Sequence, residues 1–303
     1  MTPIPLGRRA FLRGGALTLL AAGTDLAAAA PAAGGPGSKP GPGPAPGVRF
    51  GLLTDLHYAD KPAAGSRHYR RTPAKLAAAV ERFAAEKPDF TVQLGDLIDA
   101  ADDVATEKRW LGTIHKQFAQ IPGPRRHVLG NHCVDTLTKA EFLDGVGQEK
   151  SYFSFDAGGL HFLVLDACFR ADGVAYGRGN SRWDDANVPP AELEWLRADL
   201  AATRAPTVVF AHQRLDGAGR HHVRNAAAVR EILEASGRVS AVFQGHSHAN
   251  DYREVGGIHY ATLAATVEGG GEEDGGFAVA DATGDGALVV RGFRRQADYD
   301  WRA

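Results

Sequence analysis

Nine polar residues in five short blocks have side chains that bind metal ions or move protons. The blocks read T-D-L-H, G-D-L-I-D, G-N-H, A-H-Q-R and G-H-S-H, in that order along the chain. Their candidate ligands and proton donors are Asp55, His57, Asp96, Asp99, Asn131, His132, His212, His246 and His248. Carboxylate oxygen, amide oxygen and imidazole nitrogen together suit Mn, Fe or Zn, and this set requires no thiolate. The blocks therefore predict a centre that holds two divalent or trivalent metal ions.

The chemistry that such a centre supports is hydrolysis. Two metal ions roughly 3.5 to 4 Å apart can clamp the attacking and leaving oxygens of an in-line displacement and lower the pKa of a bridging water. One carboxylate must bridge the two ions. A lone D-x-H block is a weak signal, because Asp and His at a strand end more often cap a turn or bind water. Five blocks in one order, each behind a predicted strand, favour a single shared site.

The elements that must position these residues alternate between strands and helices. The predicted strands that precede the blocks cover residues 48–53, 90–94, 127–129, 207–210 and 239–243. Thr72 offers an N-cap for one helix, and Asn225 caps another helix, which Gly237 ends. Further helices are predicted around residues 104–118 and from Pro189 onward.

Consecutive strands follow in two further parts of the chain. A hairpin is predicted from residues 152–155 and 160–165, and the tail is predicted to form strands at 258–263, 276–280 and 287–293. This order predicts an α/β (α+β) fold in which two mixed sheets pack face to face with helices outside. Functional residues in such folds gather beyond the carboxyl ends of the strands, where all five blocks fall.

A long segment from residue 170 to 188, rich in Gly, Arg and Asn, has no predicted helix or strand. Loops of this length are uncommon without a function, so we expect the segment to form a wall of the substrate site. Tyr69, Tyr176 and Trp183 could stack a nucleotide base. The alternative is that these aromatic side chains pack beneath their own loops.

Composition and charge exclude several classes of protein. With 303 residues, 44% hydrophobic and 23% charged, the chain is long enough for one large core. Two cysteines, Cys133 and Cys168, are too few for a disulfide scaffold and lack the C-x-x-C spacing of a structural zinc site. Without residues 1–30, which hold three Arg and one Asp, the formal net charge changes from −2 to −4. This mild acidity argues against nucleic-acid binding.

The first 47 residues have the composition of an export signal and a tether. Residues 1–30 contain Arg8-Arg9-Ala10-Phe11-Leu12-Arg13, an apolar stretch and an alanine-rich region, and they resemble a twin-arginine signal peptide. The apolar stretch is about half the roughly 20 residues that a membrane-spanning helix needs, so no stable membrane anchor is expected after cleavage. Residues 31–47 are mostly Pro, Gly and Ala and predict a flexible linker. We therefore expect export by the twin-arginine machinery to the periplasm or the extracellular space, with the catalytic domain at 48–303.

The five blocks are similar to those of the calcineurin-like metallophosphoesterases, from about residue 49 to residue 294. This resemblance implies a four-layer α/β/β/α sandwich of two mixed sheets flanked by helices. It implies that one metal ion is held by Asp55, His57 and His248. The other ion would be held by Asn131, His212 and His246, with Asp96 bridging the two.

The same resemblance implies that His132 is not a ligand but a catalytic histidine. It would donate a proton to the leaving oxygen or stabilise charge in the transition state. Asp99 would orient His132 and favour its protonated form, although Asp99 could instead cap a helix. Two departures from family patterns stand out. Cys133 occupies the position after G-N-H where many members have an acidic residue, and purple acid phosphatases have Tyr where Asp99 stands.

Within the family, the nearest pattern is that of the manganese-dependent ADP-ribose/CDP-alcohol diphosphatases. The likeness is carried by the cluster Arg67-His68-Tyr69-Arg70-Arg71, by the stretch from Gln93 to Asp99, and by Thr262-Leu263 with Glu268. The cluster suggests that Arg70 and Arg71 clamp a second phosphate, and Arg214 could contact phosphate because it lies two residues after His212. The alternative for Arg70 and Arg71 is a solvated surface.

The sequence thus predicts an exported two-metal phosphoesterase that cleaves a phosphodiester or phosphoanhydride by attack of a hydroxide bridging the metal ions. Small-molecule phosphoesters of nucleotide type are the favoured substrates. The alternatives are a phosphomonoesterase of alkaline-phosphatase type and a non-catalytic binding protein on the same fold.

Overall fold

The computed structural model describes residues 11–13, 16–18 and 47–302, in two units that divide after Gly43. The described part of the first unit is a pair of antiparallel strands, β1 (Phe11–Arg13) and β2 (Ala16–Thr18). Most of the predicted signal peptide (1–30) and linker (31–47) lies outside the described residues, so both stay predictions. No helix among the described residues combines the length and apolar character needed to span a membrane.

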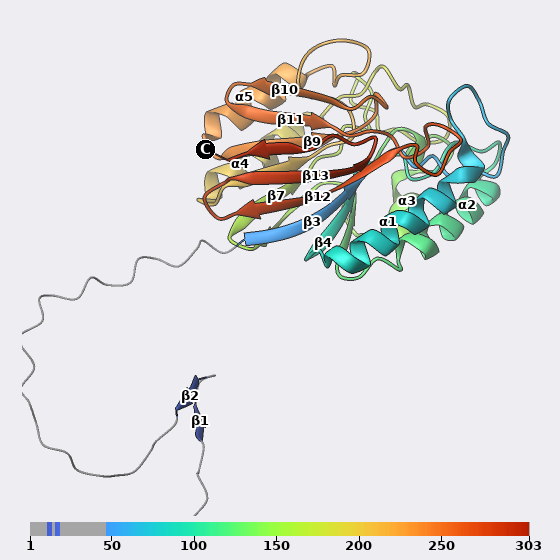
Figure 1. The fold of residues 1–303 in the computed structure, drawn as a ribbon. Coiled ribbons are helices and arrows are strands. Elements are labelled where there is room, and N and C mark those ends of the chain that lie inside the picture. Colours follow the sequence, from blue (N-terminus) through green and yellow to red (C-terminus); the bar gives the residue numbers. More distant parts are fainter. Residues whose placement is uncertain (1–10, 14–15, 19–46, 303) are drawn as a thin grey trace, which may run out of the picture. The chain divides into compact units, whose positions relative to one another are not determined.

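Two six-stranded mixed sheets form the centre of the second unit (Figure 1). The strands of the first sheet lie in the order β14 (Tyr299–Trp301), β13 (Leu288–Arg294), β12 (Gly276–Thr283), β3 (Gly47–Leu53), β4 (Phe90–Gln93) and β5 (Arg125–His127). The strands of the second sheet lie in the order β10 (Asp251–Val255), β11 (Ile258–Thr262), β9 (Val239–Gln244), β8 (Thr207–Phe210), β7 (Leu160–Val164) and β6 (Phe153–Ala157). Both sheets contain parallel strands that run side by side, β3 to β5 in the first and β7 to β9 in the second.

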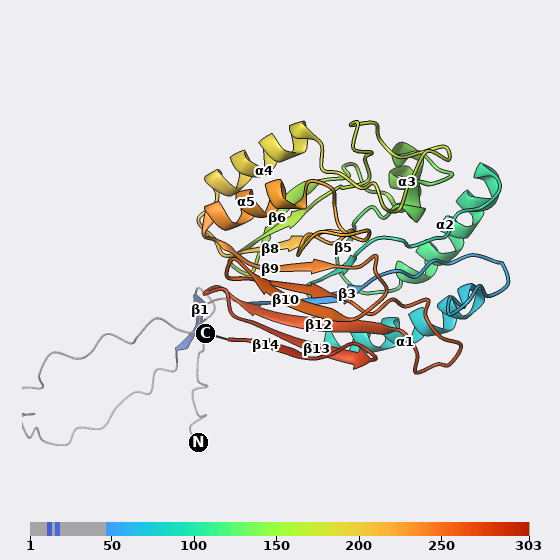
Figure 2. The same ribbon diagram turned by 90° about the horizontal axis from the view of Figure 1, so that it is seen from above.

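Helices cover the outer face of each sheet (Figure 2). The first sheet packs against α1 (Thr72–Glu86), α2 (Val104–Phe118) and α3 (Lys139–Val146), and the second against α4 (Pro190–Ala202) and α5 (Ala226–Ser236). Short 3-10 turns, η1 (Tyr69–Arg71) and η2 (His132–Val134), follow two of the loops that leave strand ends. The predicted α/β/β/α sandwich is confirmed.

The alternation of apolar side chains along the strands explains the four layers. In β3, Phe50 and Leu52 point into the core between the sheets, whereas Leu53 points toward the helices. Phe50 stacks on Phe90 with ring centroids 5.3 Å apart and contacts Phe162 of the opposite sheet edge-on at 5.6 Å. Because both faces of each central strand are buried, the strands are almost continuously apolar.

Some elements differ from their predictions. Thr72 is not the N-cap of α1 but its first residue, because its hydroxyl donates to the carbonyl of Leu56 at 2.8 Å. The strand β5 lies two residues earlier than predicted. Helix α3 was not predicted, although a capping box formed by Thr138 and Glu141 marks its start. The edge strands β10 and β14 were not predicted either, although each pairs antiparallel with the strand next to it along the chain, β11 and β13 respectively.

Candidate metal centre

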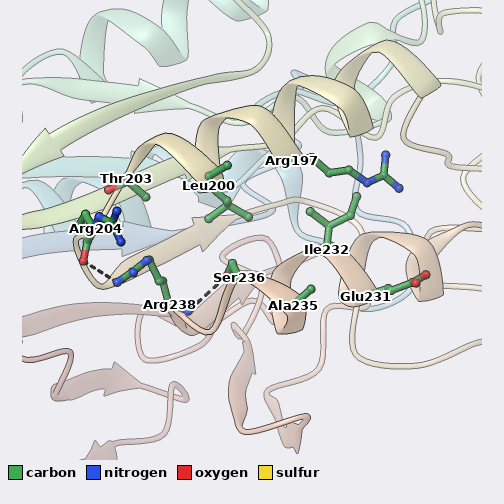
Figure 3. A pocket seen from close by; sticks show the side chains of 10 residues that line it. Arg197, Leu200, Thr203, Arg204, Glu231, Ile232, Ala235, Ser236 and Arg238 are labelled. Atoms are coloured by element: carbon green, nitrogen blue, oxygen red, sulfur yellow. Dashed lines mark hydrogen bonds between the residues drawn. The ribbon is translucent and has the colours of Figure 1, made fainter.

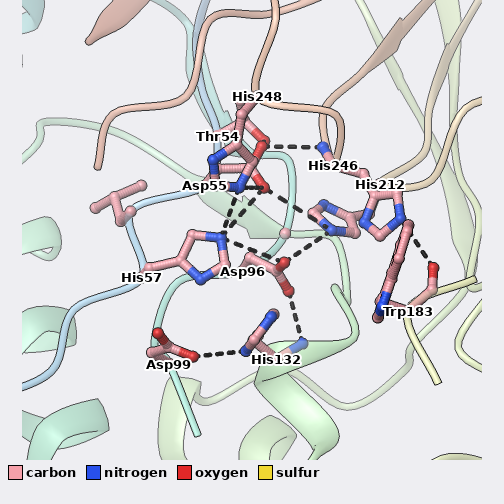
Figure 4. A network of polar contacts seen from close by, with 12 residues as sticks. Thr54, Asp55, His57, Asp96, Asp99, His132, Trp183, His212, His246 and His248 are labelled. Carbon is pink, nitrogen blue, oxygen red and sulfur yellow. Dashed lines mark hydrogen bonds and ion pairs between the residues drawn. The ribbon is translucent and has the colours of Figure 1, made fainter. Parts of the chain in front are cut away.

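The five blocks lie in loops that leave the carboxyl ends of β3, β4, β5, β8 and β9, and the structure brings them together (Figure 4). Backbone bonds tie these loops directly to one another. The amide of Asp55 donates to the carbonyl of Gly95 at 3.0 Å, and the amide of Gly245 donates to the carbonyl of His212 at 2.9 Å. The ends of strands from both sheets therefore build one cluster.

Three overlapping groups within the cluster have the geometry of metal-ion sites. Their potential ligand atoms lie within 4.8 Å of one another, and the groups are Asp55 with His57 and His248, Asp96 with His212 and His246, and His57 with Asp96 and His132. The first group matches one predicted ligand set in full. The second contains the predicted bridging carboxylate and two ligands of the other set. Asn131, the remaining predicted ligand, is buried, and its Oδ1 has no hydrogen-bond partner among the described residues.

The two buried aspartates each use one oxygen for the protein and present the other to the cluster. Oδ2 of Asp55 accepts bonds from the Thr54 hydroxyl at 2.7 Å and from the His246 amide at 3.0 Å. Its Oδ1 accepts no hydrogen bond from the part of the chain that the structure describes, and it lies 3.4 Å from Nε2 of His248. Oδ1 of Asp96 accepts the amide of His132 at 2.8 Å.

The second oxygen of Asp96 lies between the two ligand groups. Oδ2 is 3.1 Å from Nε2 of His212 and 3.5 Å from Nε2 of His57. His57 belongs to the group around Asp55, and His212 belongs to the group around Asp96. This is the position that a carboxylate shared by two metal ions requires.

Outer contacts fix the orientation of three histidine rings. Nδ1 of His212 donates to the carbonyl of Leu94 at 2.8 Å, and Nδ1 of His248 donates to Oε1 of Glu268 at 2.6 Å. In both rings Nε2 is left as the basic nitrogen. His246 is held the other way round, because its Nε2 donates to the carbonyl of Trp183 at 3.0 Å. Such contacts set the tautomer of metal-binding histidines.

The backbone at the cluster adopts a conformation that L-residues rarely occupy. Positive φ angles are found at Asp55 (51°), His57 (44°), Asp96 (51°), His246 (70°) and His248 (62°). These residues make up five of the eight non-glycine residues with positive φ in the described ranges. Asp and His enter the left-handed region more readily than most L-residues, but they still store strain there, and such strain concentrates at functional sites.

Two glycines of the blocks are required by close packing. A Cβ atom on Gly130 would lie 2.2 Å from Oδ1 of Asp96, and one on Gly245 would lie 2.6 Å from Oδ2 of Asp55. Neither space admits a side chain. The glycines in G-N-H and G-H-S-H therefore allow the loops to approach the two carboxylates.

The electrostatic field of the cluster favours cations. Burial alone would lower the pKa of His248 and of His212, but the neighbouring carboxylates raise these pKa values to about 9 and about 8. Burial would raise the pKa of Asp55, yet His248 and His212 hold that pKa well below its usual range. By contrast, burial lowers the pKa of His57 to about 4 and, together with His212, that of His246 to about 3. Oδ1 of Asp55, Oδ1 of Asn131 and Nε2 of His212 have no hydrogen-bond partner among the described residues. Carboxylate, amide and imidazole atoms of this kind, beside buried carboxylates, fit metal ions.

His132 and Asp99 form a charge pair beside the cluster. Nδ1 of His132 lies 2.6 Å from Oδ1 of Asp99, with the N–H direction poorly aligned, so the contact is an ion pair more than a hydrogen bond. Burial opposes protonation of His132, but Asp96 and Asp99 raise its pKa above the usual value. Lys61, 3.2 Å from the other oxygen of Asp99, was not foreseen from the sequence.

The predicted phosphate-binding arginines have other partners. Arg214 is buried, and its guanidinium bonds to Asp216 at 3.0 Å and to Asp251 at 2.6 Å. These bonds use Nε and Nη2, so two carboxylates already pair with the charge of Arg214. Arg70 is exposed and pairs with Asp60, and Arg71 donates to the carbonyl of Gly270 at 3.2 Å. None of the partners just named for these three arginines is a predicted metal ligand. The role of the three arginines in substrate binding stays a prediction.

A buried lysine supports the loop that carries Glu268. Nζ of Lys75 donates to the carbonyls of Thr266 at 3.0 Å, Glu268 at 2.5 Å and Gly269 at 2.7 Å. The sequence analysis noted Glu268 only as part of a family likeness and did not single out Lys75. Cys133 is a buried thiol whose Sγ accepts the amide of Leu97 at 3.4 Å, and burial raises its pKa, which makes it a poor nucleophile.

A cavity of about 430 Å³ between α4 and α5 lies at the other end of the strands (Figure 3). Residues that precede β8 and β9 line it, including Arg204 and Arg238, whereas the cluster follows the carboxyl ends of these strands. Arg238 donates to the carbonyl of Arg204 at 2.8 Å. Arg204 follows the C-terminus of α4, and Arg238 follows the C-terminus of α5. A positive side chain at such a position interacts favourably with the helix dipole, which explains both arginines without a ligand.

Comparison with known proteins places this geometry in a family. The family described as calcineurin-like phosphoesterase matches residues 48–250. The chain belongs to the calcineurin-like phosphoesterases. The predicted family is therefore confirmed, and so is the assignment to metal-dependent hydrolases. The calcineurin-like fold binds two metal ions, which confirms the predicted pair of cofactor ions.

Relatives of this phosphoesterase include two named manganese-dependent ADP-ribose/CDP-alcohol diphosphatase. The protein from Xenopus tropicalis is 34% identical over 72% of this chain and 84% of its own length. The one from Oryza sativa subsp. japonica is 24% identical over 72% of this chain and 83% of its own length. A dimetal phosphatase from Danio rerio shares the fold, with a TM-score of 0.71 and 21% identity over 85% of this chain and 100% of that chain.

Proposed function

We propose that this calcineurin-like phosphoesterase is an exported enzyme that hydrolyses phosphodiester or phosphoanhydride bonds in small nucleotide-type substrates. The observation that carries the proposal is the position of Asp96, whose Oδ2 faces His57 of one ligand group and His212 of the other. When bound there, two metal ions would activate water as a nucleophile and neutralise charge on the phosphate.

The side chains of the cluster would bind the two ions and donate the proton to the leaving group. Asp55, His57 and His248 would hold one ion, Asn131, His212 and His246 the other, and Asp96 both. His132 would donate the proton to the leaving oxygen through Nε2, because Asp99 contacts Nδ1. The raised pKa of His132 supports this role, since an acid must carry its proton at working pH.

The relatives favour a diphosphate bond over a monoester. At least five of them carry the name of a diphosphatase, and each of the five aligns with more than four fifths of its own length. A monoesterase of alkaline-phosphatase type is the main competing outcome. The test is hydrolysis of ADP-ribose, a cyclic nucleotide, a bis-aryl phosphate and an aryl phosphate by one manganese-loaded sample whose metal content is measured.

We expect ADP-ribose to have the highest kcat/KM in this panel. A clear preference for the aryl phosphate would contradict the proposed bond specificity. No turnover of any substrate by a sample with two bound ions would contradict enzymatic function and favour a binding protein.

The proposal of export rests on the sequence of residues 1–30. The pair Arg8-Arg9 is followed by the apolar pair Ala10-Phe11, as in twin-arginine signals. In a bacterial host with a twin-arginine pathway, the full chain should appear processed in the periplasm. Replacing both Arg8 and Arg9 by Lys should leave unprocessed protein in the cytoplasm. Equal export of the two forms would contradict the twin-arginine route.

A further inference from the structure

Trp183 belongs to the loop between β7 and α4, and its indole lies beside His246 of the metal-ligand cluster. Its carbonyl accepts the bond from Nε2 of His246 at 3.0 Å, which fixes its backbone beside a predicted ligand. Its side chain, however, is 38% exposed, and it is one of three large hydrophobic side chains exposed to this degree in the described ranges. Figure 4 shows the indole next to the His246 ring.

The packing of the loop does not account for the exposed indole. Tyr176 of the same loop is buried, and its hydroxyl donates to the carbonyl of Arg182 at 2.5 Å. Tyr69 is also buried. Of the three aromatic residues that the sequence offered for base stacking, Trp183 alone keeps an accessible ring. The hydroxyl of Tyr176 holds the loop at Arg182, and the indole of Trp183 keeps part of its surface exposed to solvent.

The surroundings of the indole suit a flat aromatic group. The ring of His221 lies 5.2 Å from the indole at an angle of 38°, and the ring of His246 lies 6.3 Å away. The guanidinium of Arg220 lies over the indole, 4.6 Å from its centroid. The nearest carboxylate to Arg220 is that of Asp184, at 4.0 Å, so this exposed arginine can shift and stack on a further ring.

We infer that Trp183, with Arg220 and His221, forms a subsite that binds the aromatic base of a nucleotide substrate. The inference rests on the proposed function, in which the phosphate of that substrate lies at the metal-ligand cluster. A base and its 5′-phosphate are joined by one ribose, so the two subsites must be adjacent. The contact between Trp183 and His246 provides this adjacency. Stacking on an indole discriminates an aromatic base from an alkyl or sugar group, because the base offers a π face.

The test compares two competitive inhibitors that differ only in the base. AMP and ribose 5-phosphate are titrated against hydrolysis of bis(p-nitrophenyl) phosphate by the manganese-loaded enzyme and by Trp183→Ala. Loss of one stacked base should raise the Ki of AMP about tenfold or more, and the Ki of ribose 5-phosphate should stay within about twofold of its original value. Trp183→Phe, which keeps a smaller ring, should restore part of the affinity for AMP.

Val174→Ala is the matched control, because Val174 is an exposed apolar residue of the same loop, 48% accessible. It should change neither Ki. An equal rise of both Ki values in Trp183→Ala, or no change in either, would overturn the subsite. Because bis(p-nitrophenyl) phosphate reports the activity, the ratio of the two Ki values remains measurable even if ADP-ribose is not hydrolysed. Failure of the proposed substrate class is thus distinguished from failure of the subsite.

Discussion

His132 is the residue on which the proposed proton transfer depends. Its Nδ1 contacts Asp99, its amide donates to Asp96, and its ring lies 4.7 Å from that of His57. A histidine held by two carboxylates keeps its proton to higher pH than a free one. The position of Asp99 on the far nitrogen explains how the ring can face the substrate in its acidic form.

Asp99→Asn should therefore shift the pH dependence of catalysis. Asp99 helps to raise the pKa of His132, so its neutralisation lowers that pKa, and the protonated acid is lost at a lower pH. The alkaline limb of the kcat profile should move toward lower pH. His132→Ala, which removes the acid itself, should lower kcat by roughly 100-fold to 10,000-fold.

The exposed Asp60, which pairs with Arg70, provides the control for a lost surface carboxylate. Asp60→Asn should leave the pH profile unchanged. An Asp99→Asn enzyme whose alkaline limb stays in place would show that Asp99 does not act through His132.

Residue types and their order were enough to predict the cluster, because five such blocks in one order, each behind a predicted strand, are improbable by coincidence although each block alone is a weak signal. The partners of individual side chains were not predictable. Arg214 is paired with Asp216, two residues away, and also with Asp251, which belongs to β10. A backbone carbonyl such as that of Trp183 leaves no mark in the sequence at all.

The loops that follow the strands contain glycines at which the backbone of one loop packs directly against a carboxylate of another loop. In the loop after β5, Gly130 leaves room for the carboxylate of Asp96, and a Cβ at this position would also lie 2.3 Å from the Asp96 amide. Neither group can move aside without displacing the loop after β4. The G in G-N-H is thus as specific a requirement as the Asn or the His.

Gly130→Ala should lower manganese affinity by roughly 10- to 100-fold, the range seen when contacts around metal ligands are lost. Isothermal titration calorimetry with manganese measures this change. Gly112→Ala, on α2, is the control, because a Cβ there meets nothing within 4 Å. It should leave affinity intact and stabilise the helix by about 0.5 to 1 kcal/mol. Wild-type affinity in Gly130→Ala would contradict the packing account.

His127, at the end of β5, makes the fold sensitive to acid. Both ring nitrogens are buried without hydrogen-bond partners among the described residues, and Phe118 and Phe142 lie against the ring. Burial, with His115 and Arg125, lowers the pKa of His127 to about 3. Between that value and the pKa of an unfolded histidine, about 6.5, the unfolded chain binds one proton more than the folded chain. The contribution of His127 to stability is therefore present above pH 6.5 and is lost as the pH falls.

His127→Leu should reduce this loss by up to about 1.4 kcal/mol per pH unit below pH 6.5. Urea unfolding at pH 7.5 and pH 5.0, at one manganese concentration, measures the difference. The gap between the two free energies of unfolding should be smaller in the variant than in the wild type. An identical gap in both proteins would mean that His127 does not contribute to acid sensitivity.

At the scale of the whole molecule, the cluster lies where loops from the strand ends of both sheets meet. The order of predicted helices and strands was enough to predict two sheets packed face to face with helices outside, and the family resemblance implied the four layers. The order of strands within each sheet was not predictable. Long-range pairing, such as that of β12 with β3 across more than 220 residues, depends on contacts that no local pattern encodes.

Asp96, beyond the carboxyl end of β4, is the residue proposed to bridge the two metal ions. The most direct test of this role is the metal content of purified wild-type protein, Asp96→Asn and His132→Ala, measured by elemental analysis beside kcat. We predict two ions per chain in the wild type and in His132→Ala, which should retain metal but lose turnover. Asp96→Asn should lose both metal and turnover. Two bound ions and full activity in Asp96→Asn would contradict the proposed site.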